Sequence, residues 1–147
     1  MHPYRIAVPA AAVRDLRARL RRTRWPEPEP VPDWSQGVPL AYLRDMCRYW
    51  ADGHDWTATE ARLNRIPQIV TDVDGLAVHA LHVRSPYPDA TPLVLTHGWP
   101  GSFLEFERVL WPLTDPLAHG GDPDDAFHVV VPSLPGYGFS GKPREAG

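Results

Sequence analysis

The segment from His97 to Ser102, HGWPGS, has the residue types and spacing best suited to chemistry. It follows a short apolar run at 93–96 that is expected to be a buried strand, and Gly98 permits unusual backbone conformations. Ser102 and Glu105 have the spacing of a capping box, which predicts that a helix begins there. The first N–H groups of a helix are free, and its dipole is positive at that end. The sequence therefore predicts a ligand-binding turn at the carboxyl end of a strand.

The other histidines are weaker candidates for chemistry. His119 and the acidic residues after it suggest either a metal loop or a solvated turn, and the prolines and glycines there favour the turn. These acidic residues are Asp122, Asp124 and Asp125. His79 and His82 are three apart in an expected strand, so they point to opposite faces and cannot chelate one metal together. Both are interpreted as ordinary strand residues.

Cys47 is the single cysteine of the chain. It excludes an internal disulfide framework and a cysteine-rich zinc site. Because Cys47 lies on the apolar face of a helix expected over 40–52, it is predicted to be a buried, inert thiol rather than a nucleophile.

The elements that must position HGWPGS lie in the second half of the chain. Strands are expected over 68–73 and 76–84, and the Asp74-Gly75 pair between them is a strong hairpin signal. The apolar runs at 93–96 and 127–131 flank the turn and the helix that follows it. Strand, turn, helix and apolar strand in this order indicate a parallel βαβ unit.

The first half of the chain is expected to be a helical meander. Helices are predicted over 10–22, 40–52 and 57–65, the last with a capping box from Thr57 to Glu60. The proline-rich segment 23–39 lies between the first two. It is either a ligand for a partner domain or, as its tryptophans favour, a segment packed on this chain. The arginine-rich first helix either lies on a membrane or packs on its own domain, and its narrow apolar stripe favours packing.

Composition narrows the classes of protein that the chain can belong to. The 147 residues carry a formal charge of −3, and Lys142 is the one lysine among 15 basic residues. Without a basic stripe, the sequence has no electrostatic footprint for nucleic acid, so no nucleic-acid partner is expected. No apolar run approaches the length of a membrane span, and no secretory signal is visible, so a cytoplasmic location is expected.

Two longer stretches make a family resemblance specific. HGWPGSFLEF and GGDPDDAFHVVVPSLPGYGFSGKP are similar to the epoxide hydrolases of the α/β-hydrolase superfamily. RTRWPEPEPVPDWSQGVPLAYLRDMCRYWADGHDW and ARLNRIP resemble the epoxide hydrolase N-terminal domain of the microsomal type. The resemblance implies an α/β fold: a helical segment at 1–66, then a β-hairpin and the first parallel strands of an incomplete α/β-hydrolase sheet at 67–147. Haloalkane dehalogenases share HGxP, but the helical segment argues against them.

The resemblance also assigns roles to residues. It implies that the backbone N–H of Trp99 serves an oxyanion hole, and that His97, Gly98 and Pro100 shape the turn. Another segment, Pro135, Gly136 and Tyr137, would border the substrate site. No metal or organic cofactor is implied.

The implied reaction needs groups that the sequence does not match. In the family an aspartate opens the epoxide to an alkyl-enzyme ester, lid tyrosines protonate the oxygen, and a histidine activates water to release a vicinal diol. Two segments could be compared with the motif that holds the nucleophile, and neither fits. Asp72-Val73-Asp74-Gly75 lies in the hairpin. Gly138-Phe139-Ser140-Gly141 follows a strand that does not carry the nucleophile in this fold. We therefore expect the N-terminal portion of an epoxide hydrolase, truncated and inactive alone.

A small hydrophobic epoxide is the expected substrate if a C-terminal part completes the site. The alternative function is a stand-alone binding, regulatory or oligomerisation module of the same fold. In either case an open sheet edge favours self-association.

Overall fold

The computed structural model describes residues 1–145, and their contacts divide the chain into two units. One unit, called the sheet unit, contains Met1–Ile6 together with the chain from Leu63 onward. The other, called the helical unit, is Ala7–Arg62. The expected division after residue 66 differs from this one, because the first six residues belong with the sheet.

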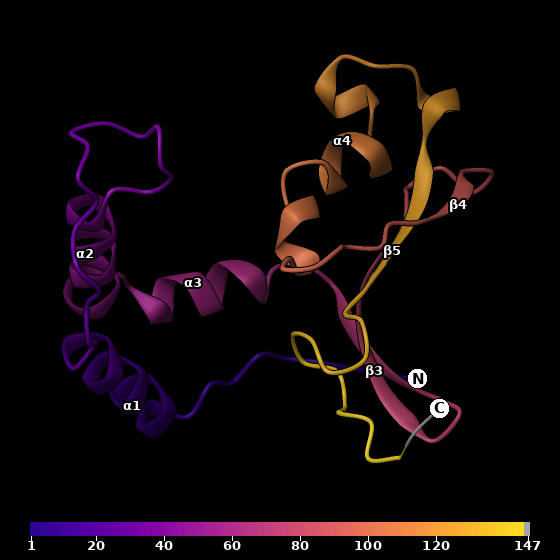
Figure 1. The fold of residues 1–147 in the computed structure, drawn as a ribbon. Coiled ribbons are helices and arrows are strands. Elements are labelled where there is room, and N and C mark those ends of the chain that lie inside the picture. The colour runs from indigo at the N-terminus through magenta and orange to yellow at the C-terminus, as the bar shows by residue number, and fades with distance from the viewer. Residues whose placement is uncertain (146–147) are drawn as a thin grey trace. The chain divides into compact units, whose positions relative to one another are not determined.

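The sheet unit contains a five-stranded mixed sheet in the order β1-β2-β3-β5-β4 (Figure 1). The strands are β1 His2–Pro3, β2 Gln68–Val73, β3 Leu76–Val83, β4 Thr91–Val94 and β5 Phe127–Pro132. β2 and β3 pair antiparallel, β3 pairs antiparallel with β5, and β4 and β5 pair parallel. The predicted hairpin and the predicted parallel unit are both confirmed.

The hairpin turn has the geometry that its residues favour. Asp74 and Gly75 have φ values of 51° and 81°, and the Asp72 carboxylate accepts a hydrogen bond from the Gly75 N–H at 3.1 Å. Asparagine, aspartate and glycine tolerate the left-handed backbone that such a two-residue turn requires. The turn places His79 opposite Val70, which sets the register of the sheet.

Strand β4 differs from the expectation of a buried strand at 93–96. It spans Thr91–Val94, and the Val94 side chain is 63% exposed. In the described part of the chain β4 pairs with β5 alone, so it forms an edge of the sheet. The apolar sequence of this run did not predict its exposure, because exposure depends on which neighbours cover the strand.

The connection from β4 to β5 is broken into short turns instead of one helix. A 3₁₀ helix spans Phe103–Phe106, and α4 spans Leu110–Thr114. Pro112 lies within α4 and cannot donate a backbone hydrogen bond to the preceding turn, so a continuous helix from residue 103 is prevented. The core of the unit forms where this connection meets the sheet, around Leu81, Leu110 and Val129.

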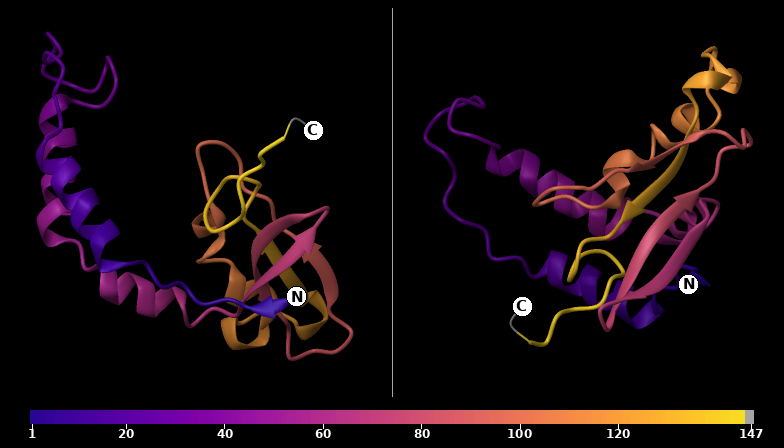
Figure 2. Two further views of the ribbon diagram at one scale, coloured as in Figure 1. Left: turned by 90° about the horizontal axis from the view of Figure 1, so that it is seen from below. Right: turned by 90° about the vertical axis from the view of Figure 1, so that its right-hand side faces the viewer.

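Three helices form the helical unit. They are α1 Ala10–Arg21, α2 Leu40–Arg48 and α3 Trp56–Leu63, and α2 continues into a π-helical turn at Tyr49–Gly53. α1 and α2 are in contact, and the left view of Figure 2 draws them side by side. All three helices were predicted.

The predicted cap of α3 is wrong. Asp55 rather than Thr57 caps the helix, because the Asp55 carboxylate accepts the Ala58 N–H at 2.9 Å. Glu60, the expected capping partner, instead accepts the Val8 N–H at 2.8 Å.

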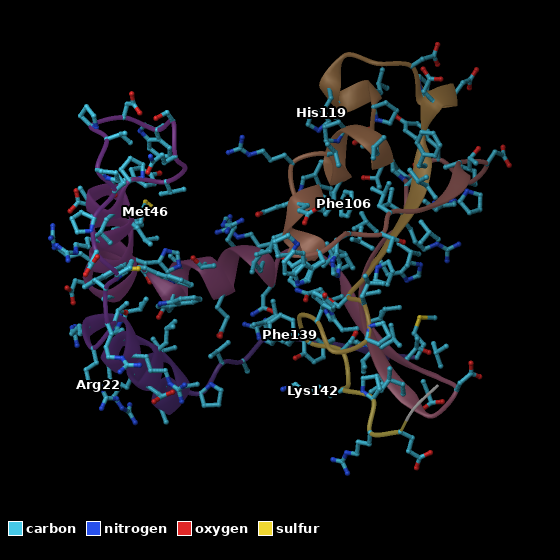
Figure 3. All side chains as sticks on the ribbon, in the orientation of Figure 1. Arg22, Met46, Phe106, His119, Phe139 and Lys142 are labelled. Carbon is cyan, nitrogen blue, oxygen red and sulfur yellow. The ribbon has the colours of Figure 1, made fainter. Side chains whose placement is uncertain are left out.

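The apolar face of α2 is exposed, contrary to the prediction. Leu40 is its one buried residue, whereas Met46 is 45% exposed (Figure 3). Cys47 is half-buried rather than buried. The proline-rich segment does contact α2: Arg44 lies over the Trp25 ring at 5.7 Å, and Trp34 meets Tyr42 edge-on at 5.1 Å.

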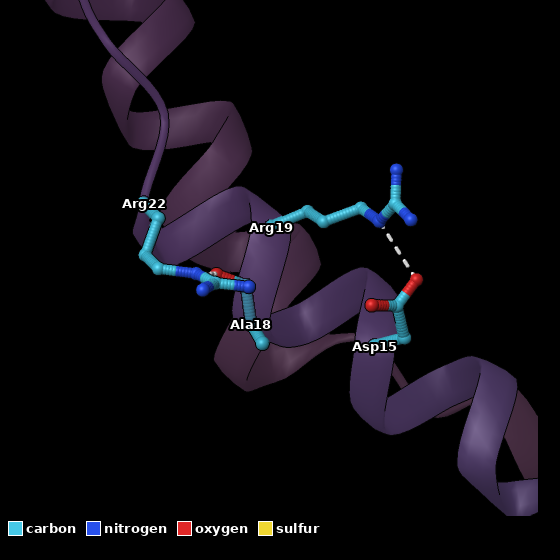
Figure 4. A network of polar contacts seen from close by, with 4 residues as sticks. All are labelled: Asp15, Ala18, Arg19 and Arg22. Carbon is cyan, nitrogen blue, oxygen red and sulfur yellow. Dashed lines mark hydrogen bonds and ion pairs between the residues drawn. The ribbon is translucent and has the colours of Figure 1, made fainter.

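Arg19 of α1 and Arg22, the residue after the helix, make local contacts. The Arg19 Nε donates to Asp15 at 2.7 Å, and Arg22 Nε donates to the Ala18 carbonyl at 3.2 Å (Figure 4).

In residues 1–145 no helix has the length and apolar character needed to cross a membrane.

Asn64 ties the first residues of the chain to the sheet unit. Its side-chain oxygen accepts the Ile6 N–H at 2.8 Å, and its side-chain nitrogen donates to the Ile6 carbonyl at 2.9 Å. This amide thereby bonds Ile6 as a neighbouring strand would. β1, which was not predicted, lies just before this pair and is too short to have a sequence period.

Candidate functional site

Two loops meet at the carboxyl ends of the parallel strands β4 and β5. The first, residues 95–102, contains HGWPGS, and the second, residues 133–141, contains PGYG. The Leu95 N–H donates to the Val130 carbonyl at 2.9 Å, which extends the pairing of the strands into the first loop. Ligands of open α/β sheets bind at the carboxyl ends of the strands, where these two loops lie.

His97 links the two loops. Its Nε2 accepts the Leu134 N–H at 3.2 Å, and its Nδ1 lies 3.1 Å from the Gly98 carbonyl. Because Nε2 accepts, Nδ1 carries the proton and donates to Gly98. The ring is buried and meets Tyr137 edge-on at a centroid distance of 5.2 Å. Both ring nitrogens are engaged, which supports the structural interpretation of His97 over a general base.

The turn after His97 presents Trp99 outward. The Gly101 N–H donates to the Gly98 carbonyl at 2.8 Å, and the Trp99–Pro100 peptide bond is cis. The Trp99 side chain is 83% exposed. Within residues 1–145 the backbone N–H of Trp99 has no hydrogen-bond acceptor. The turn therefore offers a free donor at the carboxyl end of β4.

The capping box predicted at Ser102 and Glu105 is confirmed. The Ser102 hydroxyl accepts the Leu104 N–H at 3.3 Å, and Glu105 accepts the Ser102 N–H at 3.2 Å. A Cβ on Gly101 would collide with the Glu105 carboxylate, so a side chain at this position would displace Glu105 from the cap. The Glu105 carboxylate is committed to the cap.

The second loop is held by its own backbone bonds. Gly136 has a φ of 82°, and its N–H donates to the Gly141 carbonyl at 2.8 Å. The Tyr137 N–H donates to the Leu134 carbonyl at 2.9 Å. Pro135 and Gly136 are exposed, while Tyr137 turns toward His97. The structure thus brings two of the predicted site residues, His97 and Tyr137, into contact.

His79 lies in strand β3, as predicted, but its ring makes contacts that were not predicted from the sequence. It is fully buried, with Nδ1 2.9 Å from the Ser133 hydroxyl and Nε2 2.9 Å from the Gln68 side-chain oxygen. Burial lowers the pKa of His79 from 6.5 to about 4. A signal was available, because the residues two and four further along β3, Leu81 and Val83, point to the same face and are buried.

The loop at 119–125 forms a turn, as its prolines and glycines favour. Gly120 adopts a left-handed backbone with a φ of 83°. The Asp122 carboxylate accepts the Asp124 N–H at 3.0 Å and so caps a short 3₁₀ turn at Pro123–Asp125.

Comparisons with known proteins agree with this arrangement. The family model described as "Epoxide hydrolase N terminus" matches residues 1–106. A "Putative epoxide hydrolase" of Stigmatella aurantiaca is 57% identical over 145 residues, which are 99% of this chain and 33% of that protein. The chain thus spans about a third of the length of this relative.

Two solved structures are similar along nearly the whole chain. The epoxide hydrolase of Aspergillus niger is 35% identical, with a TM-score of 0.81 over 99% of this chain and 38% of that one. The juvenile hormone epoxide hydrolase of the silkworm Bombyx mori is 29% identical, with a TM-score of 0.85 over 99% of this chain and 35% of that one.

Proposed function

The chain belongs to the epoxide hydrolase family, and from that premise we propose that it supplies the oxyanion-stabilising part of an epoxide hydrolase. The observation that carries the proposal is the free backbone N–H of Trp99, in the turn that follows β4. In α/β-hydrolases an N–H from this loop forms half of the oxyanion hole. A small hydrophobic epoxide is the proposed substrate.

The proposed reaction proceeds through an ester. A carboxylate forms a C–O bond to one epoxide carbon, the ring C–O bond breaks, and a tyrosine protonates the departing oxygen. Water, deprotonated by a histidine, then adds to the ester carbonyl and gives a tetrahedral oxyanion. The Trp99 N–H would donate to this oxyanion, whose collapse breaks the ester C–O bond. The departing alkoxide takes the proton of the new carboxyl group to give the diol and the free carboxylate, and the histidinium returns its proton to the tyrosinate.

The residues of this chain hold the donor in place and do not perform the covalent steps. His97 joins the turn to Leu134, and the capping box fixes Ser102 after the turn. No segment of the sequence has the pattern expected for the nucleophile, and Glu105 is committed to its cap. We therefore propose that the 147-residue chain forms no diol by itself.

A chimera tests this function. The matched third of the Stigmatella aurantiaca relative is replaced by this chain, and diol formation from an aryl epoxide is measured for the chimera, the parent and the chain alone. We expect diol from the chimera and the parent, and none from the chain. Diol from the chain alone, or a folded chimera that is inactive beside an active parent, would contradict the proposal.

A backbone substitution tests the donor itself. Replacing the Trp99 N–H by an ester oxygen in the chimera leaves the side chain unchanged and removes the donor. We expect kcat to fall roughly 10²–10³-fold, the range for loss of one oxyanion donor. The same replacement at Trp34, in the proline-rich segment, is the matched control and should leave kcat unchanged. Equal rates for both variants would exclude Trp99 as the donor.

The alternative of a binding or oligomerisation module keeps one observation in its favour, the exposed edge of β4. Self-association through that edge, a cytoplasmic location and the absence of a nucleic-acid partner remain predictions.

A further inference from the structure

From a buried position on β3, His79 contacts the second loop of the candidate site and the 3₁₀ helix that follows the first loop. The centroid of its ring lies 5.2 Å from that of Phe103, the first residue after the HGWPGS loop. The His79 ring meets the Phe139 ring at 5.3 Å and bonds the Ser133 hydroxyl, both in the second loop. Phe139 lies on the yellow segment after β5 in Figure 3.

The backbone of β3 fastens the same loop at further points. The Ser133 N–H donates to the His79 carbonyl at 2.8 Å, and the Gly141 N–H donates to the Ala77 carbonyl at 2.7 Å. The His79 N–H donates to the Ser140 hydroxyl at 2.9 Å. Both ends of the 133–141 loop are therefore attached beside His79.

The hydrogen bonds of the His79 imidazole are those of its neutral form. The Gln68 side-chain nitrogen donates to the Leu63 carbonyl, so its oxygen faces His79 and accepts from Nε2. Nδ1 must then accept from the Ser133 hydroxyl. A proton added to Nδ1 would turn this acceptor into a donor and would place a charge in a buried site.

We propose that His79 is a pH-sensitive positioning residue, whose neutral imidazole holds the 133–141 loop on β3 and, through Leu134, holds His97 and the Trp99 turn. We call the contacts of His79 with the 133–141 loop the clamp, and all of them lie within the sheet unit. The consequence of the clamp for catalysis rests on the proposed function.

The surroundings of His79 make its protonation costly. The side chains around the ring carry no charge between pH 4 and pH 8. They are Gln68 of β2, Phe103 after the HGWPGS loop, and Ser133, Phe139 and Ser140 of the second loop. Among the residues described, the titratable side chain in contact with the ring is Tyr4, at a centroid distance of 5.0 Å. Burial raises the pKa of Tyr4. Tyr4 therefore stays neutral in acid.

The direction of the pH effect follows from the lowered pKa. The closed loop favours neutral His79, with a pKa of about 4, whereas an exposed histidine titrates near 6.5. Above about 6.5 the clamp has its full strength, and it weakens as the pH falls toward 4. Loop opening that exposes the ring should become about 30-fold more favourable between pH 7.5 and pH 5.

Amide hydrogen exchange of the 147-residue chain, corrected for intrinsic rates, measures this opening without an epoxide. We expect the protection of the Tyr137 and Gly141 amides to fall about 30-fold between pH 7.5 and pH 5. The Thr91 amide, bonded to the Ala126 carbonyl at the other end of the β4–β5 pairing, should change less than about threefold. Equal losses at Thr91, or no loss at Tyr137, would overturn the proposal.

Variants assign the effect to His79. His79→Gln should lower protection of the loop at pH 7.5 and remove its pH dependence, whereas His54→Gln, in the helical unit, should retain it. If His79→Gln does not fold, Gln68→Glu places a carboxylate beside Nε2 and should shrink the change between pH 7.5 and pH 5. An unchanged pH dependence in either variant would overturn the role of His79. None of these readouts requires catalytic activity.

Discussion

At the scale of single residues, His97 links the Trp99 turn to the second loop. Its two nitrogens bond Gly98 in one loop and Leu134 in the other. No other hydrogen bond between these two loops is found in residues 1–145. The His97 side chain therefore provides the hydrogen bond that joins the two loops in this range.

Replacing His97 by alanine should destabilise the sheet unit by about 1–3 kcal/mol, because the Leu134 N–H loses its acceptor in a partly buried position. Urea denaturation followed by circular dichroism measures the change. His119→Ala, at an exposed histidine, should stay within about 0.5 kcal/mol of the original chain. Equal stabilities of the two variants would show that the bond to Leu134 contributes little.

The sequence predicted part of this site. The capping box at Ser102 has a fixed local spacing, so it was predictable and is confirmed. The bond from Leu134 to His97 spans 37 residues and exists because β4 and β5 are neighbours. The burial of His79 similarly depends on Ser133, 54 residues away. Such contacts leave no local pattern.

At the scale of elements, two segments with the same capping-box spacing differ in outcome. Ser102 caps its helix with Glu105, whereas Thr57 does not cap α3. The difference is competition: Asp55 is two residues earlier and accepts the Ala58 N–H, and Glu60 is taken by Val8. Spacing predicts a cap only where no better acceptor lies nearby.

Asp55→Ala should therefore weaken α3, by about 1 kcal/mol, and Thr57→Ala should change it by less than about 0.5 kcal/mol. Hydrogen exchange of the Ala58 and Thr59 amides reports the local stability of the helix. A larger effect of Thr57→Ala than of Asp55→Ala would restore the original capping prediction.

For helix α2, the sequence predicted the helix but not the exposure of its apolar face. Its period and its start after Pro39 predicted a helix, which is confirmed. The same period predicted burial of its apolar face, and Leu43, Met46 and Trp50 are exposed. Periodicity identifies which residues share a face, but not what covers that face.

At the scale of the whole molecule, the order of segments along the chain differs from their grouping in space. The α/β class, the hairpin and the parallel pair follow from periods and turn residues, so they were predictable. The membership of Met1–Ile6 in the sheet unit was not, because it depends on the distant partners Asn64 and Ile69.

The exposed edge of β4 leads to a prediction about association. We expect the chain to self-associate as its concentration rises, and Val94→Lys to reduce this, because charge on an edge strand opposes pairing with another chain. Sedimentation velocity at several concentrations measures the effect. Val73→Lys adds the same charge to an exposed valine of β2, away from that edge, and should associate like the original chain. If both variants behave alike, the β4 edge is not the contact.

The pair of bonds between Ile6 and Asn64 has a consequence for the order in which the chain folds. The two residues are 58 apart, and bringing the ends of a flexible loop of that length together costs on the order of 4 kcal/mol in entropy. The helical unit already holds Val8 beside Glu60, so folding it first leaves only a few residues to close. If the helical unit folds first, attachment of β1 is a late step whose entropic cost is lowered by helices outside the sheet.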